Sequence, residues 1–385
     1  MKKNTMTLMA AGVCAAVVAQ VANAAVSFAA GDIVVSRVSS SGSATALSSS
    51  TAATFLDVYR KTSGIWALNS SLALPSSGSG TKLTLSGTAS SEGFISRGSD
   101  NQSVAVFGYN IAAGSATGTA KTLALVDSSG TVTSRTATIS GAARSTIYTG
   151  NGFYTSTDSR VSWNANATPL TVTDIKSGNA RTLASTGSQL WVTSSSATFF
   201  AASSGPTGAG TLGTGLPTTG SQTATFAMAG SGNSPYGLCV FDTNSDGSTD
   251  LAYVADSNSL TGGITKYVLS SGSWVSMGTI GASIFGLSGY YDGSSVVLSA
   301  TSFTTALATG GTSKLYTFTD SSISGALSGT LETVATLISQ TGTVGNSQTY
   351  AEAFRGTAYM PAIPAPGAVA LIGLAGMVAS RRRRD

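Results

Sequence analysis

Short apolar and β-branched runs, each closed by turn-forming residues, make up most of this chain. The runs span five to eight residues between Gly, Ser, Asn or Asp, and spacing typical of helices is almost absent. Clear examples lie at residues 33–38, 54–59, 103–109, 189–193, 251–255 and 295–299. Turn signals that favour hairpins lie at residues 128–130, 150–152, 270–272 and 292–293. The pattern predicts an all-β protein.

Two kinds of hairpin alternate along the chain, which indicates an internal repeat. The first kind has copies that start near Gly93, Thr146, Arg181, Tyr236 and Phe285, and residues 354–359 are similar to its first strand alone. The second kind lies between these copies, as at residues 121–139 and 264–280. Two hairpins form a four-stranded sheet, and such sheets repeated around an axis form a β-propeller. We predict a β-propeller-like body of five to seven four-stranded blades over residues 25–360.

Two other folds, a β-helix and a set of sandwiches, are less consistent with the repeat. Its copies start about 35 to 70 residues apart, which is too irregular for a β-helix, and no linker-like boundary separates sandwiches. Residues 200–222, rich in Gly, Ser and Thr, are interpreted as a connection between two blades. Residues 251–275 resemble blades of six- or seven-bladed extracellular propellers. The resemblance rests on the order of four features: Tyr-Val-Ala-Asp, a Gly-containing loop, Ile-x-Lys-Tyr and a hairpin with Trp. This resemblance concerns architecture and implies no particular activity.

The N-terminus has the order of a secretory signal peptide. A positive start, an apolar run and a small-x-small motif follow one another at residues 2–3, 8–21 and 22–24. We expect residues 1–24 to be a signal peptide that is cleaved between Ala24 and Ala25.

The C-terminus combines a Pro/Gly break, an uncharged apolar run and a basic stop. The break contains Pro364, Pro366 and Gly367, and the stop consists of Arg381, Arg382, Arg383 and Arg384. The run between them, residues 368–380, would form a helix about 20 Å long, short for a bilayer core of about 30 Å. We expect a single short hydrophobic transmembrane helix, with the arginines on the cytoplasmic side. Four consecutive arginines argue against the alternative, a buried C-terminal helix.

This order over residues 363–385 resembles the PEP-CTERM sorting signal of Gram-negative bacteria, with Ala365 where the common motif has Glu. The resemblance implies two partners, the inner-membrane export machinery and an exosortase-like sorting enzyme. It also implies a Gram-negative-type bacterium, in which the protein is transiently anchored in the inner membrane and then reaches the cell surface or the extracellular space. It implies nothing about the body of the chain.

The leader and tail account for the basic character of the chain. They hold six of the 20 Lys and Arg residues and one of the 16 acids, which leaves 14 positive and 15 negative charges for the body. Nucleic acid is therefore not an expected partner. The chain has no histidine, which excludes imidazole catalysis and histidine-ligated metals. Cys239, the one cysteine outside the leader, is interpreted as a small buried hydrophobe.

The sharpest local motif is a polar loop at residues 242–250. Its side-chain oxygens at alternating positions, with Gly247 to permit the turn, suit a hard cation, and they belong to Asp242, Asn244, Asp246, Ser248 and Asp250. The loop resembles the calcium loops of integrin-type propellers and dockerins, and departs from an EF-hand at Tyr253. We hypothesise a calcium ion that stiffens the loop. The alternative is a polar hairpin loop without metal.

The body offers few candidates for catalysis, and no catalytic residue is assigned. Its glutamates, at positions 92, 332 and 352, lie in no recognisable motif for glycoside cleavage. Side chains that could project at a propeller mouth are Asp256, Arg97, Arg144 and Arg355, although such strand-end residues more often pair or cap turns. Trp191 and Trp274 are expected to pack in the core or between blades rather than to stack on sugars.

These features favour a non-enzymatic function. We expect an exported cell-surface or extracellular-matrix protein, a structural or binding propeller with extracellular polysaccharide as its partner. The alternative is an extracellular hydrolase or lyase that acts on polysaccharide from a propeller scaffold.

Overall fold

The computed structural model of the chain describes residues 26–40, 47–167, 170–200, 207–303, 312–338 and 352–360. The expected signal peptide, its cleavage site between Ala24 and Ala25, and the expected sorting segment at residues 363–385 lie outside these ranges. The described part is all-β, as predicted, and contains no helix with the length and apolar character needed to cross a bilayer.

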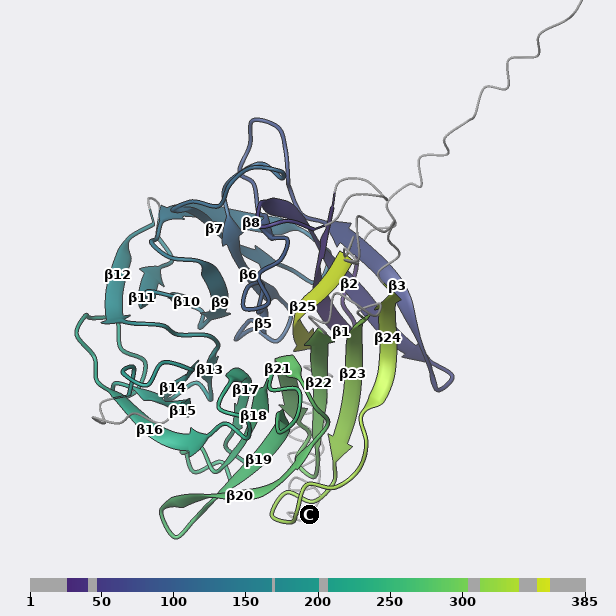
Figure 1. Ribbon diagram of the computed structural model, residues 1–385, viewed down its shortest axis with the longest axis vertical. Coiled ribbons are helices and arrows are strands. Elements are labelled where there is room, and N and C mark those ends of the chain that lie inside the picture. The colour runs from purple at the N-terminus through teal and green to yellow at the C-terminus, as the bar shows by residue number, and fades with distance from the viewer. Residues whose placement is uncertain are drawn as a thin grey trace, which may run out of the picture.

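Six antiparallel sheets surround a central axis (Figure 1). Blade 1 consists of β25 (Glu352–Tyr359), β1 (Ile33–Ser39), β2 (Thr51–Thr62) and β3 (Ile65–Ala73), with β4 (Leu85–Ser86) paired to β2. Blade 2 consists of β5 (Ser96–Arg97), β6 (Val104–Tyr109), β7 (Ala120–Val126) and β8 (Val132–Thr138). Blade 3 consists of β9 (Ala143–Tyr148), β10 (Gly152–Thr157), β11 (Arg160–Ala165) and β12 (Val172–Ser177).

The other three blades are built in the same way. Blade 4 consists of β13 (Leu183–Ser185), β14 (Leu190–Ser194), β15 (Gly208–Leu212) and β16 (Ala224–Ala229). Blade 5 consists of β17 (Pro235–Phe241), β18 (Leu251–Asp256), β19 (Gly263–Ser270) and β20 (Ser273–Ile280). Blade 6 consists of β21 (Ile284–Tyr291), β22 (Val296–Phe303), β23 (Thr312–Asp320) and β24 (Glu332–Ile338).

The inner strands of the six blades form a closed ring. In order these strands are β25, β5, β9, β13, β17 and β21, and each one contacts the inner strand of the next blade. The chain is therefore a six-bladed β-propeller, within the predicted range of five to seven blades. Each pair of neighbouring blades also shares an apolar core of its own, and a further buried cluster lies where inner strands of several blades meet.

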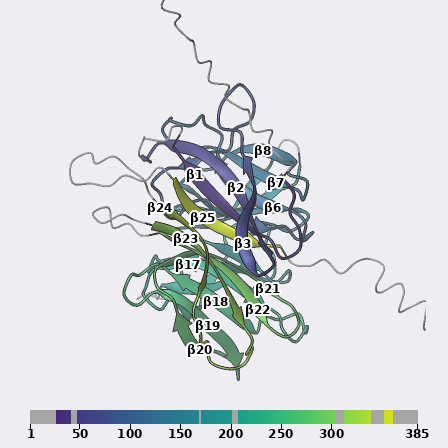
Figure 2. The same cartoon turned by 90° about the vertical axis from the view of Figure 1, so that its right-hand side faces the viewer.

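Blade 1 joins the two ends of the propeller domain. Its inner strand, β25, comes from the C-terminal side of the chain and pairs antiparallel with β1 (Figure 2). This pairing confirms the interpretation of residues 354–359 as a last copy of the first strand of the repeat. The ring is thus closed by backbone hydrogen bonds and packing.

Buried hydroxyl groups connect successive blades at four places. Each hydroxyl lies on the second strand of one blade and donates a hydrogen bond to a backbone carbonyl on, or just before, the inner strand of the next blade. The pairs are Ser36 to Gly93, Ser156 to Arg181, Thr193 to Tyr236, and Thr301 to Arg355. These bonds explain why Ser and Thr occupy buried positions in otherwise apolar strands, since a buried hydroxyl needs a partner.

The prediction that residues 200–222 form a connection between blades is wrong, because β15 of blade 4 lies within them. The glycines of this strand have a packing role. A Cβ atom on Gly208 would lie 1.9 Å from the carbonyl oxygen of Met228, and one on Gly210 would lie 2.1 Å from that of Thr225. The strand is rich in glycine because the neighbouring β16 approaches its backbone closely.

Trp191 and Trp274 pack between blades 4 and 5, as predicted. Their rings meet edge to face, with centroids 5.7 Å apart and an interplanar angle of 89°. The indole N–H of Trp191 donates to the Thr249 hydroxyl at 3.2 Å. Both indoles thus belong to the contact between blades.

Candidate functional site

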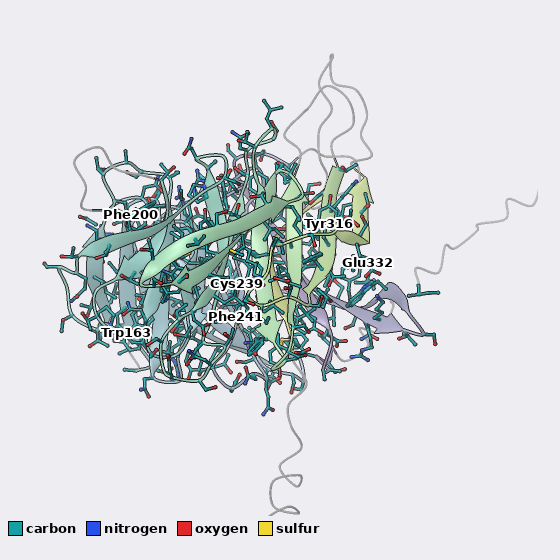
Figure 3. The ribbon with its side chains drawn as sticks, turned by 90° about the horizontal axis from the view of Figure 1, so that it is seen from below. Trp163, Phe200, Cys239, Phe241, Tyr316 and Glu332 are labelled. Atoms are coloured by element: carbon teal, nitrogen blue, oxygen red, sulfur yellow. The ribbon has the colours of Figure 1, made fainter. Side chains whose placement is uncertain are left out.

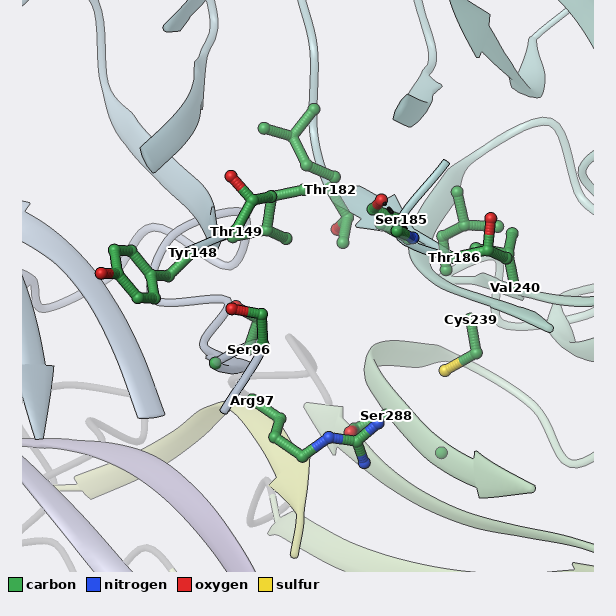
Figure 4. Close-up of a pocket in the computed structure, with 18 of the residues that line it drawn as sticks. Ser96, Arg97, Tyr148, Thr149, Thr182, Ser185, Thr186, Cys239, Val240 and Ser288 are labelled. Carbon is green, nitrogen blue, oxygen red and sulfur yellow. Dashed lines mark hydrogen bonds between the residues drawn. The ribbon is translucent and has the colours of Figure 1, made fainter. Parts of the chain in front are cut away.

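A cavity of about 570 Å³ lies where the C-terminal halves of the inner strands converge (Figure 4). Residues from β5, β9, β13, β17 and β21, and from the loops that follow them, line it. Because inner strands run in the same direction along the axis, equivalent positions of successive blades meet there. We call this space the axial cavity. In a view from below, Cys239 of its lining lies near the middle of the molecule, far from Trp163 and Glu332 (Figure 3).

The lining of the axial cavity changes from apolar to polar along four of its five inner strands, whereas on β17 it stays apolar as far as Phe241. The aliphatic residues come first, and they are Ile95, Ile147, Leu183, Leu238 and Leu287. Hydroxyl groups follow on the same strands or just after them, and they belong to Ser99, Thr149, Ser185, Thr186 and Ser288, while the hydroxyl of the lining residue Ser96 is itself buried. The cavity therefore offers an apolar floor and a rim of groups that can both donate and accept hydrogen bonds.

Arg97 is the cationic side chain of this lining. Its Nη1 donates to the Tyr359 carbonyl oxygen at 3.2 Å, and its guanidinium lies over the Tyr290 ring, 5.8 Å from the centroid. Burial lowers the pKa of Arg97. The salt bridges found among the described residues do not include Arg97. The structure thus confirms Arg97 at a propeller mouth, without a carboxylate in contact.

Cys239 lines the axial cavity from β17 as a free, buried thiol. Burial raises its pKa, so the thiol stays protonated in ordinary conditions. The structure confirms its interpretation as a small buried hydrophobe.

Aromatic side chains close the opposite end of the channel. Phe94 of blade 2 and Tyr236 of blade 5 meet with ring centroids 5.9 Å apart, and Phe285 lies 4.8 Å from Tyr236. Blades 2 and 5 lie on opposite sides of the ring, so this contact spans the channel. Among the described residues, these aromatic rings therefore separate the axial cavity from the opposite end of the channel.

Arg144, Arg355 and Asp256 lie toward this closed end and do not project at a mouth. Arg144 donates to the Ala180 carbonyl at 3.0 Å, and Arg355 donates to the Gly87 carbonyl at 2.6 Å. Burial lowers the pKa of Arg355 to about 10. The carboxylate of Asp256 accepts the N–H groups of Gly232, Ser234 and Asn258. The alternative interpretation, in which such residues pair or cap turns, is correct for these three.

No protein-family model and no curated protein sequence matches the chain. Three solved structures resemble it over most of its length. A chain of the nidogen–laminin complex has 9% identity and a TM-score of 0.46, over 86% of this chain and 100% of that chain. TolB from Acinetobacter baumannii has 13% identity and a TM-score of 0.47, over 86% and 67%. A protein from Lactobacillus plantarum has 11% identity and a TM-score of 0.42, over 84% and 99%. Likeness at this level carries no information about function.

The predicted calcium loop connects β17 to β18, and its first residue, Asp242, reaches the axial cavity. Asp242 accepts the N–H groups of Asp246 and Gly247 at 3.2 and 2.8 Å. Asp250 accepts the N–H and the hydroxyl of Thr243. In the described part of the chain, no three acidic, Cys or His side chains form a metal-sized group. These contacts are those of a polar turn, and calcium stays a prediction.

Two of the other proposed ligands of the loop accept hydrogen bonds from its own backbone. Asn244 accepts the Asp246 N–H at 3.0 Å, and Asp246 accepts the N–H of Ser248 at 2.7 Å. A cation would have to compete with these N–H donors for the same oxygens. A calcium-bound loop would therefore differ from the one described in its hydrogen bonds.

Sequence reasoning missed most residues of the axial cavity. Ser96 and Ser288 directly follow Ile95 and Leu287 in two copies of the first repeat strand. Alignment of those copies would have shown that equivalent positions carry hydroxyls. Their convergence on one axis, however, required the closed ring of blades.

Proposed function

We propose that this chain is an exported, non-enzymatic binding propeller whose axial cavity holds a saccharide of an extracellular layer. The cavity itself carries the proposal, because five blades contribute hydrogen-bonding side chains to one concave space. Its volume of about 570 Å³ is typical of small-molecule sites, which span about 300 to 1,000 Å³. An apolar floor below a hydroxyl-rich rim suits a sugar ring, which has apolar faces and polar edges.

The lining favours binding over glycoside cleavage. Hydrolysis by two carboxylates requires a pair of acids that face one bond. Asp242 is the acid among the residues that line the axial cavity, and its oxygens accept backbone N–H groups of its own loop. Release of reducing ends from any polysaccharide by the purified protein would favour the hydrolase alternative instead.

Export and sorting form the second part of the proposal, and they rest on the sequence patterns of leader and tail. The order of the segments supports them, since β25 ends at Tyr359 and the sorting segment begins at residue 363. Removal of that segment by an exosortase-like enzyme would leave all strands of blade 1 in place. The released product would then be a complete propeller.

The first test fills the axial cavity. Ser96 lines it, and the Ser96 hydroxyl is buried without a hydrogen-bond partner, so Ser96→Trp adds bulk there and removes no hydrogen bond. Calorimetric titration with fragments of acidic and neutral extracellular polysaccharides should show binding to the unmodified chain and at least about tenfold weaker binding to Ser96→Trp.

The matched control is Ser134→Trp, on the exposed face of the outer strand β8. It should bind as the unmodified chain does. Equal affinity of both Trp variants would place the ligand outside the axial cavity. Absence of binding to every polysaccharide would leave the propeller a structural role only.

The calcium hypothesis gives a separate prediction. Asp246→Ala should lower the melting temperature in millimolar calcium and leave it unchanged in chelator, because a bound ion would stiffen the loop only when its ligands are complete. Asp127→Ala is the control, since the Asp127 carboxylate caps a turn through Ser129 and Thr131. If calcium does not separate the melting curves of Asp246→Ala and the unmodified chain, the loop is a polar turn.

A further inference from the structure

Arg97 has hydrogen-bond donors that the protein does not use. A guanidinium carries five N–H donors. Within the described residues, the hydrogen bond found for this side chain is that from Nη1 to the Tyr359 carbonyl. Buried polar atoms without a partner do occur in the described part of the protein, but none belongs to Arg97. The unused N–H groups of Arg97 therefore reach open space, and Arg97 lines the axial cavity.

The other arginines on or next to the inner strands differ from Arg97 in their place, because none of them lines the axial cavity. In Arg144, Arg181 and Arg355 the Nε atom is buried without a partner, and other donors of the same group bond to backbone carbonyls. Arg181 also covers the Tyr236 ring at 3.8 Å from its centroid, at the closed end of the channel. Arg144 and Arg355 are buried, and Arg181 is half-buried against this ring. Arg97 is the one that a ligand in the axial cavity can reach.

No negative charge of the cavity lining contacts the Arg97 guanidinium. The groups that face it are the Tyr290 ring and the Cys239 thiol, whose raised pKa keeps it neutral. Asp242 also belongs to the lining and follows β17. Its carboxylate accepts the N–H groups of Asp246 and Gly247 in its own loop. The lining thus carries one cation and one carboxylate, and the Arg97 guanidinium faces the axial cavity without the carboxylate in contact.

The surroundings of Arg97 indicate which anion would fit. Figure 4 shows the guanidinium beside Ser288, with Ser96 on the same strand and Ser185 and Thr186 across the cavity. A planar guanidinium binds a carboxylate through two parallel hydrogen bonds. Hydroxyls around it pair with the hydroxyls of a sugar ring. Both features meet in one ligand class, the uronic acids.

We infer that the axial cavity binds a uronate residue of an acidic polysaccharide, with Arg97 paired to its carboxylate. This inference rests on the proposed function and names the ligand class of the same site. The hydroxyl rim contacts the ring hydroxyls, and the aliphatic floor contacts an apolar face of the ring. Binding of the carboxylate offsets the cost of keeping a cation in the cavity without a partner.

The test compares matched sugars on the full chain by calorimetric titration. Glucuronate and galacturonate should bind at least about tenfold more tightly than glucose and galactose, which lack only the carboxylate. Arg97→Gln should weaken uronate binding by about tenfold to a hundredfold and leave the affinity for the neutral sugars unchanged. Arg97→Lys should retain part of the preference, because it keeps the charge and loses the bidentate geometry.

The control is Arg135→Gln, at a half-buried position on the outer strand β8 far from the inner strands. It should bind uronates as the unmodified chain does. Equal affinity of the unmodified chain for glucuronate and glucose would overturn the inference and leave the proposed function standing. Failure to bind any of the four sugars or any polysaccharide would overturn both. The comparison of sugars needs no variant, so it decides the matter even if Arg97→Gln does not fold.

Discussion

A chain that stops at residue 351 is expected not to fold, whereas a chain that stops at Met360 is expected to melt at the temperature of the longer chain. The two differ by β25, the inner strand of blade 1. Without it, β1 loses its antiparallel partner and blade 1 is left without its innermost strand. Blade 6 also loses the surface on which β21 and β22 pack.

The expected loss is large because β25 is almost wholly buried. Phe354 packs edge to face on Tyr59, Arg355 is enclosed, and the Thr301 hydroxyl donates to the Arg355 carbonyl. The lost burial and hydrogen bonds exceed the net stability of about 5 to 15 kcal/mol that folded proteins have. Circular dichroism during heating, with limited proteolysis, measures the outcome. Cooperative melting of the 351-residue chain at an unchanged temperature would show that the ring does not need β25.

The second large effect is expected at a buried ion pair between blades 5 and 6. Lys266 of β19 and Asp320 of β23 lie 2.7 Å apart, with 0% and 4% of their side chains exposed. The Tyr253 hydroxyl donates to the same carboxylate oxygen at 2.6 Å. Asp320→Ala leaves the ammonium buried without its counter-charge, and should lower the free energy of unfolding by about 3–5 kcal/mol, measured by urea denaturation.

Two controls separate the charge effect from packing. The double variant Lys266→Met with Asp320→Leu should recover more than half of the loss, because it removes both charges and keeps apolar volume. Glu332→Ala breaks an exposed ion pair, in which the side chain of Glu332 is 50% exposed and that of Lys61 39%. This change should lower the free energy of unfolding by less than about 1 kcal/mol. Similar losses for Asp320→Ala and Glu332→Ala would contradict the assignment of a buried ion pair.

The architecture could be predicted because its signal is local and repeated. Alternating apolar and turn-forming residues specify strands and hairpins, and the recurrence of two hairpin types specifies blades. Even the closing strand was visible, since residues 354–359 match the first strand of the repeat without the rest of a blade. The sequence repeat does not determine the number of blades, because its copies vary in length.

The error at residues 200–222 has a physical cause. Composition indicates a loop there, since Gly, Ser and Thr are good turn formers. In blade 4 the same glycines serve a strand, β15, that lies against the backbone of β16 at Gly208 and Gly210. Close approach between strands is a property of the packed sheet, and no pattern along the chain records it.

The sequence by itself determines four features: the leader and tail motifs, the neutral charge of the body, the all-β class and the repeat. Each of them depends on composition or on residues close together in the chain. The axial cavity is a property of the tertiary structure alone. Arg97, Cys239 and Ser288 come from three different blades, and only the closed ring brings them to one space. The same folding encloses Arg144 and Arg355 and leaves donors of Arg97 open to that space. Arg97 lies at the end of β5 that lines the axial cavity and Arg144 near the start of β9, so these arginines differ in role because packing decides burial and partners.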